Sequence, residues 1–146
     1  MSEILSPIPP VARILGLGGL IPFVALSVAV VAGVTIPVIG NAPQALANYA
    51  AVIVSFIGAV HWGVAVGTNN AREQHFIYSV IPALLAWVLL FFPIKISLFG
   101  MAVVVVGAYL ADRTLIFAVT RPGYATLRLQ LTVVVSLSLL CAALAL

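Results

Sequence analysis

The sequence predicts an all-α integral membrane protein, with residues 1–146 forming a single bundle of five transmembrane helices. The chain is 64% hydrophobic and only 6% charged, whereas an average soluble domain is about 25% charged. Its apolar residues also fall into five long runs separated by short breaks. Six basic and three acidic side chains cannot cover a soluble domain with polar groups, and one cysteine cannot form an internal disulfide. A soluble globular protein, a disordered chain and a disulfide scaffold are therefore excluded.

The predicted helices cover residues 13–33, 45–67, 76–92, 96–120 and 124–146. A hydrocarbon core of about 30 Å is crossed by about 20 helical residues at about 1.5 Å each. Four of the runs reach that length, and the third is shorter. Because backbone groups in lipid must be paired within their own segment, these runs are expected to be helices.

Several breaks and prolines define the individual elements. The segment before the first run contains Glu3 but no Lys or Arg, so we expect a retained span rather than a cleaved signal peptide. Pro22 and Pro82 should kink the first and third helices, because each removes one helical hydrogen bond. Pro93 ends the third run, and residues 93–95 alone separate it from the fourth. These two runs therefore form a tight helical hairpin.

The basic residues predict an orientation. With five spans, the N-terminal tail and the second and fourth loops share one side of the membrane. That side carries five arginines, Arg13, Arg72, Arg113, Arg121 and Arg128, and the other side carries only Lys95. Since Lys and Arg concentrate on the cytoplasmic side, we expect a cytoplasmic N-terminus and a C-terminus outside. No Arg- and Ser-rich transit segment is visible, which favours the bacterial inner membrane.

Asp112 in the fourth run is the most informative polar residue. An ionisable side chain inside a span usually faces the bundle interior or a partner. Arg113 points about 100° away on a helix and is expected to snorkel to the headgroups. The partner of Asp112 should therefore come from another helix, either as Arg128 or as Arg13. A clasp that fixes helix register is the favoured interpretation, and a proton relay or ligand site stays open.

His61 lies about 9 Å along its helix from Gly67, by the helical rise. A histidine at this depth needs a hydrogen bond, and Asp112, Tyr78 and Ser79 are expected in the same leaflet. We favour a packing role over a haem ligand, because the second imidazole, His75, is expected in a loop. No Cys and His spacing suggests zinc or another metal.

Other polar and small residues complete the predicted cluster. Tyr124, Arg128 and Thr132 recur every four residues on one face of the fifth helix. Trp62 and Trp87 are expected near the cytoplasmic and outer interfaces, and Tyr124 as an interfacial aromatic. Gly63 and Gly67 form a Gly-x-x-x-Gly pair, which is a weak signal for close helix packing.

Two blocks of the sequence are specific, namely Ser55-x-x-Gly58-x-x-His61-Trp62-Gly63 and Leu127-Arg128-x-x-Leu131-Thr132. With these blocks, the chain resembles the transmembrane protein 69-like family over nearly its whole length. Members are small multi-pass proteins of bacteria and of the mitochondrial inner membrane. The resemblance implies architecture and location, and it supplies no established reaction, substrate or cofactor.

Three functional hypotheses follow. The first is a non-enzymatic accessory or assembly subunit of a larger respiratory or other energy-transducing membrane complex, because the chain has almost no mass outside the membrane. The second is a small proton-coupled carrier with Asp112 and His61 as titrating groups. The third is a binder of a lipid-soluble ligand, a quinone or a haem. Expected partners are membrane lipids and other integral membrane subunits, and no nucleic acid, enzyme activity, catalytic residue or cofactor is expected.

Overall fold

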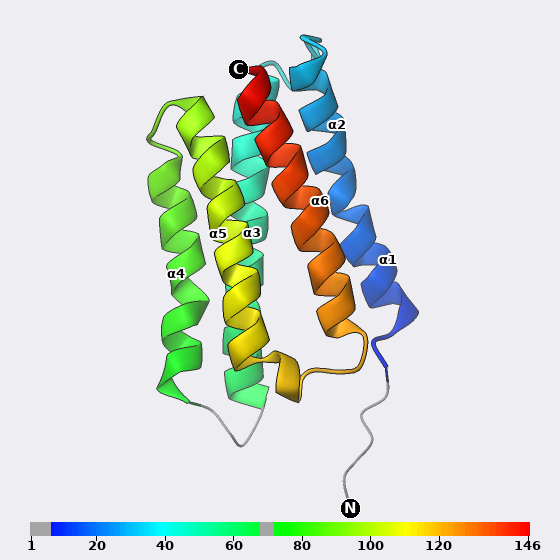
Figure 1. Ribbon diagram of the computed structural model, residues 1–146, viewed down its shortest axis with the longest axis vertical. Helices are drawn as coiled ribbons and strands as arrows, with labels where there is room; N and C mark the ends of the chain where they lie inside the picture. The colour runs from blue at the N-terminus through cyan, green and yellow to red at the C-terminus, as the bar shows by residue number, and fades with distance from the viewer. Residues whose placement is uncertain (1–6, 68–71) are drawn as a thin grey trace, which may run out of the picture.

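The computed structural model describes residues 7–67 and 72–146, and Glu3 lies outside these ranges. The described residues are helical and contain no named strand, so the all-α prediction is confirmed for them. The helices pack side by side into one bundle (Figure 1). In chain order they are α1 (Pro10–Gly18), α2 (Leu20–Val31), α3 (Ala42–Gly67), α4 (Glu73–Leu89), α5 (Ile94–Leu115), the short 3-10 helix η1 (Phe117–Val119) and α6 (Tyr124–Ala145).

Within the described residues, four stretches are long and apolar enough to cross a membrane. They are Pro10–Val31, which joins α1 and α2, and the helices α3, α5 and α6. The helix α4 has 17 residues, or about 25 Å by the helical rise. It nevertheless lies beside α5 along the bundle (Figure 1). The predicted hairpin of the third and fourth runs is therefore present.

The first predicted span is two helices in line rather than one. It begins at Pro10, where a missing N–H costs nothing at a helix start, and it is interrupted at Gly19. The interruption lies three residues before Pro22, which lacks the N–H that would bond the carbonyl of Gly18. The hydroxyl of Tyr49 on α3 donates a 3.0 Å hydrogen bond to the carbonyl of Gly19. A proline defect predicted from sequence is thus stabilised by a neighbouring helix.

The prediction that the third helix starts at Phe76 is wrong by three residues. Arg72 is extended and α4 begins at Glu73, whose negative charge is favourable at a helix N-terminus. His75 is therefore inside a helix and buried, not in a loop. This correction matters for the site, because it places a second imidazole beside His61.

The fourth helix ends at Leu115 and not at Thr120. The next residue, Ile116, is fully buried. The Phe117 ring then packs between those of Tyr109 and Tyr124, at 5.7 and 6.0 Å between ring centres. Gly123 completes the turn with a positive φ of 89°, a conformation that favours glycine.

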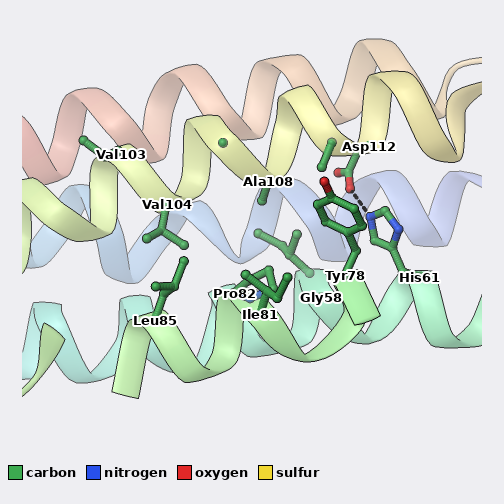
Figure 2. Close-up of a pocket in the computed structure, with 13 residues that line it drawn as sticks. Gly58, His61, Tyr78, Ile81, Pro82, Leu85, Val103, Val104, Ala108 and Asp112 are labelled. Atoms are coloured by element: carbon green, nitrogen blue, oxygen red, sulfur yellow. Dashed lines mark hydrogen bonds and ion pairs between the residues drawn. The ribbon is translucent and has the colours of Figure 1, made fainter. Parts of the chain in front are cut away.

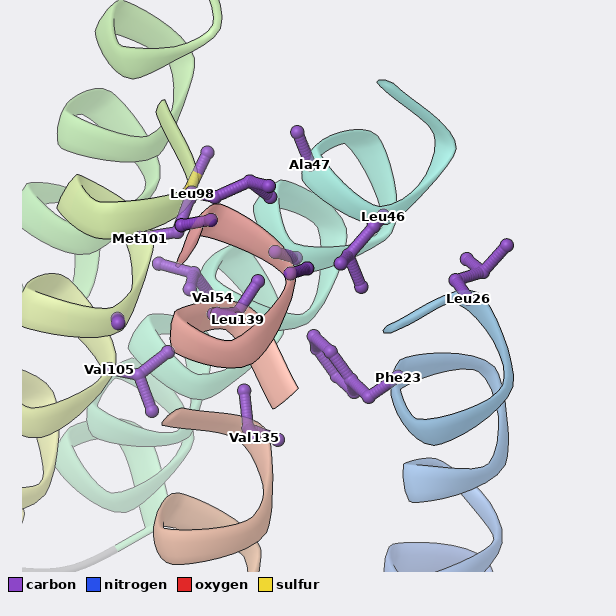
Figure 3. Close-up of a cluster of buried hydrophobic side chains, with 14 of the residues drawn as sticks. Phe23, Leu26, Leu46, Ala47, Val54, Leu98, Met101, Val105, Val135 and Leu139 are labelled. Carbon is purple, nitrogen blue, oxygen red and sulfur yellow. The ribbon is translucent and has the colours of Figure 1, made fainter. Parts of the chain in front are cut away.

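The hydrophobic core lies between α2, α3, α5 and α6 (Figure 3). Phe23 from α2, Leu46 and Val54 from α3, and Leu139 from α6 are buried there. Alanines fill much of the remaining space, which allows membrane helices to approach closely. The buried ionisable side chains His61, His75, Asp112 and Arg128 lie outside this core cluster.

The closest approach of α3 to α4 occurs at Gly58. A β-carbon at this position would collide with the backbone carbonyl oxygen of Ser79. By contrast, β-carbons at Gly63 and Gly67 would meet nothing within 4 Å among the described residues. The predicted Gly-x-x-x-Gly interface is therefore wrong, because this pair faces away from the neighbouring helices.

Candidate functional site

A chain of buried hydrogen bonds joins three helices in the half of the bundle that contains residues 58–67 and 112–132. Nε2 of His61 on α3 lies 2.7 Å from Oδ1 of Asp112 on α5. Nε of Arg128 on α6 donates to Oδ2 of the same carboxylate at 2.6 Å. Nη1 of Arg128 donates to the hydroxyl of Thr132 at 2.8 Å. We call these four residues the polar network.

The burial of the polar network explains why its members must be paired. Asp112 is 1% exposed, His61 3% and Arg128 4%. An isolated charge at this burial is very costly, and an ion pair with further hydrogen bonds compensates for that cost. A carboxylate only accepts hydrogen bonds, so Nε2 of His61 must carry the proton in this contact. Both oxygens of Asp112 are thereby satisfied.

Not every atom of the polar network has a partner. Nδ1 of His61 and Nη2 of Arg128 are buried and have no hydrogen-bond partner in the described structure. Buried polar atoms without a partner are uncommon in folded proteins. These two atoms are therefore the first places to look for binding chemistry.

A cavity of about 280 Å³ lies against the network, between α4 and α5, with α3 as its floor. Figure 2 shows Asp112 and His61 at one end of it and the Tyr78 ring turned toward both. The rest of the lining is apolar, including Ile81 and Leu85. Outer residues of this lining are exposed on the side of the bundle, so the cavity opens laterally between α4 and α5.

Two aromatic side chains of α4 surround the His61 imidazole. The ring centre of Tyr78 is 6.4 Å from that of His61, and the ring centre of His75 is 6.2 Å from it. Tyr78 is a predicted member of this cluster, whereas His75 is predicted to lie in a loop. The position of His75 depends on the first three residues of α4, which begins at Glu73.

The other predicted cluster residues are placed differently. Arg13 is exposed on α1, so its place in the cluster is wrong, because its position on the helix faces outward and Arg128 reaches Asp112 instead. Ser79 is buried, but its hydroxyl donates to the carbonyl of Phe76 within α4 at 2.6 Å. The Ser79 hydroxyl therefore bonds within its own helix and does not join the polar network.

The residues predicted at the interfaces lie on the outside of the bundle. Trp62 is 52% exposed and stacks edge-on against Phe76. Trp87 is 59% exposed and packs in the same way against Phe91. Arg113 is exposed. Tyr124 is half-buried, one helical turn before Arg128.

The fold and the buried polar network define a multi-pass helical membrane protein. The chain belongs to the family described as "Protein of unknown function (DUF3429)", which it matches over residues 8–144. It is similar to Transmembrane protein 69 of Xenopus tropicalis, with 36% identity over 140 residues, covering 92% of this chain and 54% of the relative. The chain thus spans about half the length of that relative. No solved structure matches it.

Proposed function

We propose that this protein binds a lipid-soluble ligand of the quinone type in the lateral cavity between α4 and α5. The observation that supports the proposal is an apolar, laterally open cavity with Tyr78, His61 and Asp112 at its inner end. Small-molecule sites typically combine apolar walls with a few placed polar groups. A quinone has this chemistry, because its flat apolar ring carries carbonyl oxygens that accept hydrogen bonds.

The polar end of the cavity offers donors to such a ring. The Tyr78 hydroxyl can donate to a carbonyl oxygen. Asp112 uses one lone pair on each oxygen for His61 and Arg128, and a carboxylate has about four acceptor sites. A reduced quinol hydroxyl could therefore donate to the same carboxylate. The isoprenoid tail would leave through the opening toward the acyl chains.

The haem and carrier hypotheses gain less support. His75 lies beside His61, but it is not among the residues that line the cavity beside His61. A proton carrier needs a water path to buried titrating groups. His61 and Asp112 are almost fully buried, and the cavity that reaches them is lined mainly by apolar side chains.

A variant at Gly107 tests the proposal without touching the polar network. Gly107 lines the cavity, and a β-carbon there would meet nothing within 4 Å among the described residues. Gly107→Phe should therefore fill the cavity while the bundle still folds. Gly63→Phe is the matched control, because Gly63 has equally open surroundings and lies outside this cavity.

The experiment uses equilibrium dialysis to measure the binding of a short-chain ubiquinone to the purified protein in nanodiscs. We expect wild type and Gly63→Phe to bind alike and Gly107→Phe to bind about tenfold more weakly or not at all, since tenfold corresponds to about 1.4 kcal/mol. Equal binding by both variants, or no binding by wild type, would overturn the proposal.

The proposed setting is the bacterial inner membrane, with five spans, a cytoplasmic N-terminus and a C-terminus outside. The distribution of charge supports this setting. Arg72 directly precedes α4 and Arg121 lies between η1 and α6, at one end of the bundle, whereas Lys95 lies at the other end, in the first turn of α5. Association with other membrane subunits of a respiratory complex remains a proposal from sequence. Native mass spectrometry of gently solubilised membranes would test it.

A further inference from the structure

A second cavity lies on the other side of the polar network. It has a volume of about 430 Å³ and is bounded by α1, α2, α3 and α6. Its lining is apolar except near Arg128 and Tyr124. Phe56 and Leu15 line it and are each 70% exposed, so this cavity also opens on the side of the bundle. It shares no polar lining residue with the lateral cavity between α4 and α5.

Arg128 lines this cavity and carries one nitrogen without a hydrogen-bond partner among the described residues. Its side chain is 4% exposed, and Nε and Nη1 are engaged by Asp112 and Thr132. Nη2 is buried and has no partner in the described part of the chain. A guanidinium carries five N–H donors in a fixed plane, and burying one of them unpaired is costly. The Nη2 group of Arg128 therefore lacks an acceptor among the described residues.

The depth of Arg128 indicates which acceptor is suitable. It lies four residues after the start of α6, about 6 Å along the helix, so it is close to the headgroup layer. Tyr124 stands one turn nearer the helix start on the same face and lines the same cavity. Guanidinium groups bind phosphate oxygens through strong, charge-assisted hydrogen bonds.

The charge at this end of the bundle favours an anionic head group. The described acidic residues there are Glu73 and Asp112, against five arginines, Arg13, Arg72, Arg113, Arg121 and Arg128. Asp112 balances Arg128 and Glu73 balances one more arginine, so five basic minus two acidic residues leave a net charge of +3 among the described residues at this end. A lipid with net negative charge matches this surplus, whereas a zwitterionic lipid does not.

We infer that this second cavity is a binding site for an anionic phospholipid, whose phosphate accepts a hydrogen bond from Nη2 of Arg128. The acyl chains lie along the apolar walls formed by α1, α2 and α6. Gly16 also lines this cavity, at a place where α1 lies close to Leu127 and Leu131 of α6. The inference is independent of the quinone proposal, because it uses a different cavity and a different donor.

Two variants test the site without relying on loss of Arg128 alone. Ala12 is exposed and lines the cavity, so Ala12→Phe should block it while the polar network stays intact. Val11→Phe is the matched control, because Val11 is 60% exposed and lies outside the cavity. Arg128→Lys keeps the charge but removes the planar donor edge.

The probe is phosphatidylglycerol, presented with phosphatidylcholine in mixed nanodiscs and detected as retained adducts by native mass spectrometry. Wild type and Val11→Phe should retain phosphatidylglycerol in preference to phosphatidylcholine. Arg128→Lys should retain about tenfold less, as expected for one lost charge-assisted hydrogen bond. Ala12→Phe should also retain at least about tenfold less, because its ring occupies the space of the lipid. Gly107→Phe should retain as much as wild type. Undiminished retention by Ala12→Phe, or equal retention of the two lipids by wild type, would overturn the inference.

Discussion

Asp112 on α5 and Arg128 on α6 form a buried ion pair, with 2.6 Å between Oδ2 of the carboxylate and Nε of the guanidinium. Both side chains are nearly inaccessible. Replacing Asp112 with Ala leaves Arg128 buried without its counter-charge. In soluble proteins such a loss costs about 3–5 kcal/mol, although polar contacts between membrane helices average only about 0.6 kcal/mol.

We therefore expect Asp112→Ala to lower the free energy of unfolding by about 2 kcal/mol, between these two limits. Unfolding in detergent, followed by circular dichroism, measures the change. Arg113→Gln is the control, because it removes a neighbouring charge that is exposed. A loss for Asp112→Ala no larger than that of the control would show that the ion pair does not stabilise the bundle.

Gly58→Ala should destabilise the contact between α3 and α4. The added methyl group would collide with the backbone oxygen of Ser79, and overpacking of this kind costs about 1–3 kcal/mol. Gly63→Ala should be neutral or stabilising, because its surroundings are open and alanine is a better helix former by about 1 kcal/mol. Thermal unfolding of the two variants compares them directly. Equal melting temperatures would contradict the close approach at Gly58.

His61 should tolerate an amide but not an alkyl group. Gln can donate a hydrogen bond to Asp112 as the imidazole does, so His61→Gln should unfold within about 0.5 kcal/mol of wild type. His61→Leu leaves one carboxylate oxygen unpaired and should cost about 1–2 kcal/mol. The same unfolding assay separates them. If Gln were as damaging as Leu, the hydrogen bond seen between His61 and Asp112 would not be what stabilises this position.

Reporter fusions test the proposed topology. Fusions after Arg72 and after Arg121 should read cytoplasmic, and a fusion at the C-terminus should read periplasmic, because the arginines concentrate on one side. A cytoplasmic C-terminus would mean an even number of spans. It would then be α4, the short helix, that fails to cross the membrane.

The helices and the ion pair between Asp112 and Arg128 could be predicted from the sequence. Long apolar runs in a chain with so few charges determine where the helices lie. A lone carboxylate within such a run requires a partner from another helix, and Arg128 at similar depth provides it. The bounds of the helices were less predictable, since they depend on local contacts such as the fully buried Ile116.

The cavities could not be predicted, because they arise where helices from distant parts of the sequence fail to fill the space between them. The proximity of His75 to His61 depended on three residues at the start of α4. Similarly, Gly58 and Gly63 look alike in the sequence, and only the packing shows that Gly58 faces Ser79. Packing also decides between Arg13 and Arg128, which the sequence offers equally as partners of Asp112. Arg128 forms the ion pair and Arg13 is exposed.

The most direct test of the proposed quinone site is photolabelling with an azido-substituted ubiquinone, followed by peptide mass spectrometry of the wild-type protein. The lateral cavity predicts labels on α4 and α5, within 78–85 and 103–112, that disappear when unlabelled short-chain ubiquinone is added in excess. Labels spread over all lipid-facing helices, or labels that the unlabelled quinone does not displace, would contradict a quinone site beside His61 and Asp112.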